Sequence, residues 1–236
     1  MTFLWKTIFY NPLYNLLAFF ILISPGRDVG IAVILLTLLV KIILFPLSKK
    51  AIVSQFKLKI LQPKIDKIKE ETTDKQLQAQ KTFALYKEEG VNPFSSCAIL
   101  LVQLPILFAL YYVFLSGLGS MTTANLYSFI PPVDYLNTRF LGLIDMAKPD
   151  VILSILAGLS QFFQLKYQPI TQEKPTNEKD LQAMLAYNMS SQMKYILPII
   201  ITVVSLKLPA ALALYWVVSN TVTLIQERAI KRSLAL

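Results

Sequence analysis

One lysine, Lys41, lies inside a long apolar stretch, residues 30–47 (GIAVILLTLLVKIILFPL). Lysine is costly to place in hydrocarbon, at about 2.5–3.5 kcal/mol on insertion scales. Two interpretations compete: either the side chain snorkels so that its ammonium reaches the lipid headgroups, or it lies in a polar cavity between helices. Thr37 precedes Lys41 by one helical turn and lies on the same face. This face can line a wet groove. The polar cavity is favoured because apolar residues follow Lys41, and Lys49 and Lys50 already mark the cytoplasmic edge.

The rest of the chain excludes several kinds of chemistry. It has no histidine and a single cysteine, Cys97, which excludes histidine-dependent catalysis, histidine zinc sites and a disulfide framework. Its 14 carboxylates all fall outside the predicted spans, which argues against an ion-driven pump and against paired-carboxylate catalysis. Ser219 and Lys41 are the residue types of a Ser–Lys hydrolytic pair, but no nucleophile-elbow pattern accompanies them. We therefore expect no enzyme activity, no metal and no cofactor.

The candidate site combines one cation with uncharged polar groups. Because no acid is available in the predicted spans, we expect Lys41 to need water or a transient anionic partner. Amides and hydroxyls in spans also join helices together, and this alternative stays open for Gln161, Gln164 and Asn220. The residues that we assign to a substrate groove are Lys41, Thr37, Gln103, Gln164, Tyr215 and Ser219.

Composition defines the class of protein that must position these residues. Of the 236 residues, 55% are apolar, and the mean hydropathy is +0.54, which is too apolar for an ordinary soluble domain of this size. Several long apolar runs predict an all-α, polytopic membrane protein. The net charge of +9 suits an anionic surface, and we expect anionic lipids rather than DNA as that partner.

The apolar runs predict five membrane spans. They are residues 30–47, 94–118, 151–165, 195–206 and 209–225. A very tight connection, residues 207–209, joins the last two spans into a helical hairpin. Lysine-rich and lysine-poor loops alternate along the chain, and the positive-inside rule then places the N-terminus outside and the C-terminus in the cytoplasm.

The N-terminal segment, residues 1–24, is aromatic-rich and interrupted at Pro12. Three interpretations compete: an uncleaved signal-like segment, a true span, and an amphipathic helix lying at the membrane interface. We favour the interfacial helix for residues 1–28, ahead of a core formed by residues 29–236. It would place Trp5, Tyr10 and Tyr14 at headgroup depth.

Residues 50–91 predict a cytoplasmic helical hairpin. Ile52, Phe56, Ile60, Ile65 and Ile68 recur near helical spacing with lysines opposite. A turn ending in Asp74 as an N-cap follows, and then a second apolar face formed by Leu77, Phe83, Ala84 and Tyr86. The hairpin is either a solvated connector or a docking arm, for which Lys57, Lys64 and Lys67 are candidate contact residues. The loop at 168–193 is polar, and we expect it to be mobile.

Four segments carry a resemblance to a known family. They are LVKIILFPLSKKAIVSQFKLKILQPKI (39–65), ALYKEEGVNPFSSCAILLVQLPILFALYYV (84–113), LSQFFQLKYQP (159–169) and LPAALALYWVVSNTVTLIQ (208–226). In these segments and their intervals the chain resembles the YidC insertase family from residue 30 onward. Lys41 matches the position where that family typically has an arginine, and lysine lacks the planar bidentate fork of arginine.

The resemblance implies a fold and a function. The implied fold has five core helices around a hydrophilic groove that is closed outside and open to cytoplasm and lipid, plus a cytoplasmic helical hairpin and an N-terminal interfacial helix. We expect a short form without a large extracytoplasmic domain. The implied function is a membrane protein insertase and chaperone of the inner (plasma) membrane. It would move nascent membrane protein segments into the bilayer, with the ribosome and a Sec-type translocon as further expected partners.

Two alternatives to an insertase remain open. A small-molecule transporter or channel would need a through-pore or a coupling carboxylate, and the predicted spans contain no such acid. The second alternative is a purely structural scaffold subunit that stabilises a larger translocon.

Overall fold

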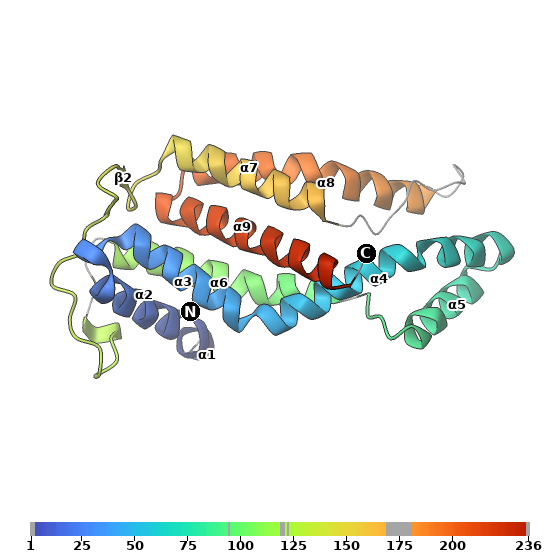
Figure 1. Cartoon of the computed structure of the whole chain (residues 1–236), viewed down its shortest axis with the longest axis horizontal. Helices are drawn as coiled ribbons and strands as arrows, with labels where there is room; N and C mark the ends of the chain where they lie inside the picture. The colour runs from blue at the N-terminus through green and yellow to red at the C-terminus, as the bar shows by residue number, and fades with distance from the viewer. Residues whose placement is uncertain (1–2, 94, 119–120, 122, 169–180, 235–236) are drawn as a thin grey trace.

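A computed structural model gives the fold and describes residues 3–93, 95–118, 121, 123–168 and 181–234. Long helices dominate these residues and run roughly along one axis (Figure 1). A short antiparallel pair of strands, β1 (Arg139–Phe140) and β2 (Ile144–Asp145), lies in the connection between two of the helices. The all-α fold class predicted from composition is confirmed.

The core of the bundle is built around α9 (Ala210–Ser233), which lies between two groups of helices (Figure 1). On one side are α7 (Val151–Tyr167) and α8 (Leu181–Ser205), and on the other are α3 (Val29–Ile43) and α6 (Ser95–Gly117). The first turns of α9 are small and apolar, and they are fully enclosed. The elements that carry the predicted groove residues thus meet around one central helix.

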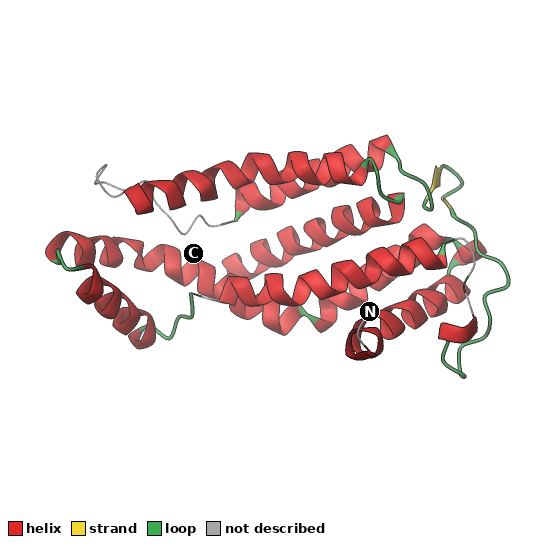
Figure 2. Cartoon of the chain, turned by 180° about the vertical axis from the view of Figure 1, so that it is seen from behind, coloured by secondary structure: helices red, strands yellow, loops and turns green. Residues whose placement is uncertain are grey.

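The two ends of the bundle differ in what connects the helices. At one end, the connection before α7 is hydrogen-bonded to the starts of α3 and α9: Asn137 accepts from the Val29 amide at 2.9 Å and Lys148 from the Ala210 amide at 2.8 Å. The opposite end carries a projecting helical hairpin and the end of α9 (Figures 1 and 2). This separation matches the predicted alternation of lysine-poor and lysine-rich loops, while the number of spans and the orientation stay predictions.

The first predicted span, residues 30–47, is wrong in its end point. Helix α3 ends at Ile43, and α4 (Phe45–Glu71) begins after a bend of 63°. Pro46 lies in the first turn of α4, where its missing N–H and fixed φ are tolerated. Lys41 therefore lies in the last turn of α3 and not in the interior of a longer helix.

The projecting hairpin consists of α4 and α5 (Lys75–Glu88). Asp74 caps α5 by accepting a hydrogen bond from the Gln76 amide at 2.8 Å, as predicted for an N-cap. Its small core contains Leu58, Leu61, Ile65 and Val91, with Leu85 and Tyr86 packed beside it.

Part of the predicted hairpin packing is wrong. Ile60, Leu77 and Phe83 are exposed rather than packed in the hairpin core. Ile52 and Phe56 are buried, but they pack against Ile230 of α9. The first turns of α4 therefore belong to the bundle, since their apolar face is covered by α9 rather than by α5.

The N-terminal segment is one continuous helical stretch formed by α1 (Phe3–Trp5), the π-helical turn η1 (Lys6–Tyr10) and α2 (Asn11–Ile23). Phe3–Ile23 is long and apolar enough to cross a membrane by length and composition. Tyr10 and Tyr14 are buried within the protein, and their placement at headgroup depth stays a prediction. An interfacial location for the whole segment stays a prediction.

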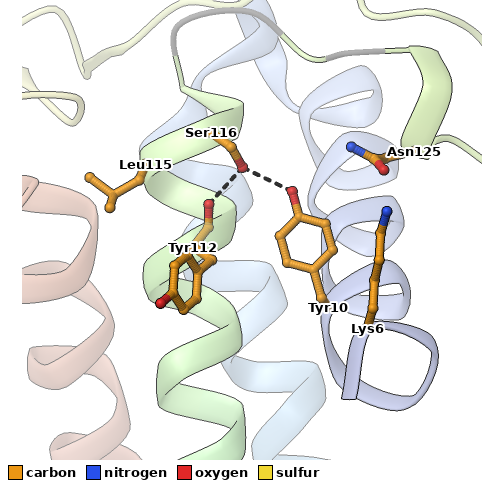
Figure 3. Close-up of a pocket in the computed structure, with 6 residues that line it drawn as sticks. All are labelled: Lys6, Tyr10, Tyr112, Leu115, Ser116 and Asn125. Carbon is orange, nitrogen blue, oxygen red and sulfur yellow. Dashed lines mark hydrogen bonds between the residues drawn. The ribbon is translucent and has the colours of Figure 1, made fainter. Parts of the chain in front are cut away.

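One face of the N-terminal segment is turned toward α6, and residues of both line a pocket of about 430 Å³ (Figure 3). Within it the Tyr10 and Ser116 hydroxyls are hydrogen-bonded at 2.9 Å. Nearby, the Asn15 side chain donates to the Asn125 carbonyl and accepts from the Tyr127 amide. The short helix η3 (Thr123–Asn125) is thereby attached to α2, and a 3-10 turn, η2 (Pro25–Arg27), leads from α2 to α3.

The polar loop predicted at 168–193 is shorter than expected. Helix α8 already begins at Leu181, so the predicted fourth span, 195–206, corresponds only to its C-terminal half. Residues 169–180, for which we predicted mobility, lie outside the described residues.

Candidate functional site

Helix α9 carries a polar side chain every four residues, at Tyr215, Ser219, Thr223 and Glu227. This spacing places them on one face of the helix. Tyr215, Ser219 and Glu227 are buried and Thr223 is half-buried, so the face points into the bundle. A continuous polar stripe therefore runs along the most central helix of the protein.

Lys41 reaches this stripe from α3. Its ammonium donates a hydrogen bond to the Thr223 hydroxyl oxygen at 2.8 Å. The Thr223 hydroxyl donates in turn to the Ser219 carbonyl oxygen at 2.9 Å, which orients its oxygen as an acceptor. Of the two interpretations of Lys41, this contact fits a polar site between helices rather than a side chain extended toward lipid headgroups.

Glu227 corrects the prediction that no acid accompanies Lys41. Its carboxylate lies close enough for the two charges to interact electrostatically. The residue is 4% exposed, and its Oε1 accepts a hydrogen bond from the Gln168 side chain at 3.2 Å. Among the described residues, its Oε2 is fully buried without a hydrogen-bond partner. A buried carboxylate therefore lies one turn beyond the threonine that holds the ammonium.

Helix α7 supplies amides to the same region. The Gln161 amide donates to the Gln164 side-chain oxygen at 2.9 Å, and both residues are buried. The Asn220 side chain of α9 donates a hydrogen bond to the Ser160 hydroxyl of α7 at 3.0 Å. Asn220 therefore joins two helices, which was one of the two roles left open for it. The Gln161–Gln164 hydrogen bond lies within α7, and Gln164 lies beside Glu227.

Helix α6 closes the other end of the stripe. The Gln103 side-chain amide donates to the Tyr215 hydroxyl, which is buried and also hydrogen-bonded to the Ser219 side chain. Thr37 is buried as well, but its hydroxyl donates to the Val33 carbonyl of its own helix at 2.7 Å. Thr37 therefore lies beside Lys41 without offering its hydroxyl hydrogen to a ligand.

We call the connected groups the interior polar cluster. Its members are Lys41, Gln103, Gln164, Gln168, Tyr215, Ser219, Thr223 and Glu227. Five of the six predicted groove residues belong to it. The predictions missed Thr223, Gln168 and Glu227, although the four-residue spacing from Tyr215 points to Thr223 and Glu227. Glu227 was overlooked because it follows the apolar run that ends at Ile225.

The arrangement can bind an anion, because a lysine ammonium has three donor hydrogens and Thr223 takes one of them. Among the described residues, no three Cys, Asp or Glu side chains lie together in a way that could hold a metal ion. The predicted hairpin residues Lys57, Lys64 and Lys67 are exposed and lie on the projecting arm. Lys64 pairs with Glu89 at 2.6 Å, and this hydrogen bond raises the pKa of Lys64.

The fold and the interior polar cluster define an apolar helical bundle with a charged, hydrogen-bonded centre. The sequence profile of the family described as "60Kd inner membrane protein" matches residues 20–235. The chain belongs to this family, whose curated members include proteins named membrane protein insertase YidC.

Two relatives show the extent of the match. The membrane protein insertase YidC of Actinobacillus succinogenes is 36% identical over 98% of this chain, and the match covers 38% of that relative. Its counterpart in Clostridium tetani is 36% identical over 86% of this chain and 81% of its own length. The chain therefore spans well under half of the first relative but most of the second.

A solved structure confirms the fold. The crystal structure described as an active YidC insertase with its first transmembrane domain resolved has a TM-score of 0.55 to this chain, at 24% identity. The alignment covers 94% of this chain and 45% of that protein.

Proposed function

We propose that this chain is a membrane protein insertase and chaperone that moves nascent segments from the cytoplasm into the bilayer. The single observation that carries the proposal is the hydrogen bond from the Lys41 ammonium to Thr223, which holds a cation between helices of the bundle. Family membership and the insertase names of the relatives support it.

In the proposed mechanism, the hydrophilic flank of a nascent segment enters a groove beside the interior polar cluster. Lys41 attracts acidic residues of that flank, and the amides and hydroxyls along α9 lower the cost of bringing polar groups partway across the bilayer. The apolar part of the segment then moves into lipid, driven by transfer of about 25 cal/mol per Å² of apolar surface.

The proposed setting is the inner (plasma) membrane, with five spans, the N-terminus outside and the C-terminus in the cytoplasm. This orientation places the α4–α5 hairpin in the cytoplasm, where its exposed lysines suit anionic lipids or the ribosome. We also propose that the chain acts alone or beside a Sec-type translocon, and that the N-terminal helical segment lies at the outer interface.

The test is insertion of a single-span substrate with an acidic tail into vesicles that contain the purified protein. Lys41→Ala removes the charge, and we expect it to lower insertion on the order of tenfold, the ratio that corresponds to about 1.4 kcal/mol. Lys41→Arg keeps the charge and should retain insertion. Unchanged insertion with Lys41→Ala would remove this residue from the mechanism.

The same vesicles test the alternative transporter or channel. An insertase should show no ion flux that depends on Lys41. Flux that disappears with Lys41→Ala, together with unchanged substrate insertion, would support the transporter instead.

A further inference from the structure

Resting on the proposed function, we infer that Glu227 is a specificity-determining residue: its carboxylate competes with an acidic substrate side chain for the positive charge of Lys41. In this proposal, the charge that partly neutralises Lys41 between substrates comes from the protein itself. It concerns selectivity among substrates rather than the ability to insert them.

The position of Glu227 supports this assignment. Thr223 and Glu227 are four residues apart on α9, so they lie one turn apart on the same face. The ammonium that Thr223 holds at 2.8 Å is therefore in the same part of the bundle as the Glu227 carboxylate, and the two charges are near enough to attract each other.

The environment of the carboxylate points in the same direction. Glu227 is 4% exposed, and Oε2 has no hydrogen-bond partner among the described residues. Leaving a buried charged oxygen without a partner is costly, whereas an opposite charge nearby offsets that cost. Lys41 is the cation that interacts with this carboxylate, so the two residues stabilise each other's charge inside the bundle.

A hydrogen bond from α7 also holds the carboxylate in place. The Gln168 side chain donates to Oε1 at 3.2 Å, at the end of α7. The neutral Gln168 side chain therefore positions the Glu227 carboxylate without cancelling its charge, and that charge can still interact with Lys41. A substrate carboxylate that approaches Lys41 must compete with a charge that is already positioned.

Competition of this kind sets how acidic a substrate flank must be before it gains from binding near Lys41. A neutral flank gains nothing from Lys41, while an acidic flank gains only the difference between its own interaction and that of Glu227. Removing the Glu227 charge should therefore strengthen capture of acidic flanks and leave neutral flanks unaffected.

The experiment uses stalled nascent chains with matched tails that carry no Asp, one Asp or two Asp, and measures their crosslinking to the full-length protein in vesicles. Glu227→Gln keeps the shape and a side-chain oxygen for Gln168 but removes the charge. We expect it to raise crosslinking of the one-Asp tail on the order of tenfold relative to the neutral tail. Glu70→Gln, at an exposed position of the hairpin, removes the same charge elsewhere and should leave this ratio unchanged.

A double-mutant cycle separates competition from a structural effect. On a Lys41→Ala background, Glu227→Gln should no longer change the ratio between acidic and neutral tails. An equal gain on that background, or a ratio that stays the same or falls in the single variant, overturns the proposal. If Lys41→Ala also leaves insertion unchanged, then the proposed function fails as well, and the two failures are thus distinguishable.

Discussion

Two lysines, Lys41 in the bundle and Lys64 in the hairpin, each lie beside a glutamate but in opposite surroundings. Lys64 and Glu89 form an ion pair at 2.6 Å with side chains that are 60% and 37% exposed. Lys41 instead donates to Thr223, and its acid, Glu227, is 4% exposed. Exposed ion pairs contribute little because water and salt screen them. Charges inside the bundle are expensive to hold there, and their retention indicates a role beyond stability.

The same contrast holds for helix caps and for glycines. Asp28 caps α3 inside the bundle, and Asp74 caps α5 on the hairpin. Gly158 lies where α7 meets α8, whereas Gly90 lies in open space at the end of the hairpin. These matched pairs allow the difference between the two regions to be measured.

The largest expected effect on stability comes from Asp28→Ala. The Asp28 carboxylate is 5% exposed and accepts from the amides of Gly30 at 2.7 Å and Leu141 at 2.8 Å. It also accepts from Ile31 at 3.1 Å. Because the substitution leaves buried donors without a partner, we expect the free energy of unfolding to fall by about 3 kcal/mol. Denaturant unfolding in detergent measures it, and a loss below that of Asp74→Ala would contradict the comparison.

Next in size is Gly158→Ala. A methyl group there would collide with the Thr202 side chain and lie 2.9 Å from the Pro198 carbonyl oxygen. Forcing α7 and α8 apart should cost about 1–3 kcal/mol. In the matched variant, Gly90→Ala, the added methyl group has no atom within 4 Å, but alanine must adopt φ +62°. This backbone strain should lower the free energy of unfolding by about 1 kcal/mol. Thermal unfolding in detergent should rank the two variants in this order, and the reverse order would show that the helix contact adapts.

A smaller loss is expected for Asp74→Ala, which removes the one hydrogen bond to the Gln76 amide at the exposed start of α5. An exposed N-cap of this kind contributes about 1 kcal/mol. Hydrogen exchange of the α5 amides should rise while exchange in α9 stays the same. Equal increases in both helices would mean that the hairpin and the bundle unfold together.

The smallest effect is expected for Lys64→Ala, because its pair with Glu89 is exposed to solvent. Insertion of the acidic-tail substrate should change by less than about twofold, in contrast to the loss expected for Lys41→Ala. A loss as large as that of Lys41→Ala would show that the hairpin lysines act directly on the substrate.

Sequence reasoning captured the parts of the fold that depend on local pattern. Apolar length predicted α6 and α7 closely and the start of α9, which continues eight residues beyond the predicted span, and the helix-capping signal at Asp74 was correct. The bend before Phe45 was missed because an apolar run continues through it, although Pro46 marks a helix start. Helical spacing also predicted that Ile60 and Phe83 pack in the hairpin, but both are exposed. Periodicity identifies an apolar face of a helix but not what packs against it.

The candidate site was predicted less completely than the fold. Lys41 stands out in any apolar run, and Tyr215 and Ser219 lie within the last span. Glu227 lies two residues beyond that span, and an acidic residue at such a position normally indicates a solvent-exposed helix end. Only the packing of α9 against α3 and α7 shows that this turn is buried.

The central claim is that a nascent chain meets Lys41 inside the bundle. The most direct measurement places a photoreactive residue beside the acidic tail of a stalled nascent chain and identifies the crosslinked residues of this protein. The account predicts crosslinks on α3 and α9 around Lys41 and Thr223 that are lost with Lys41→Ala. Crosslinks confined to the exposed residues Ile42 and Ile43, and unaffected by Lys41→Ala, would contradict it.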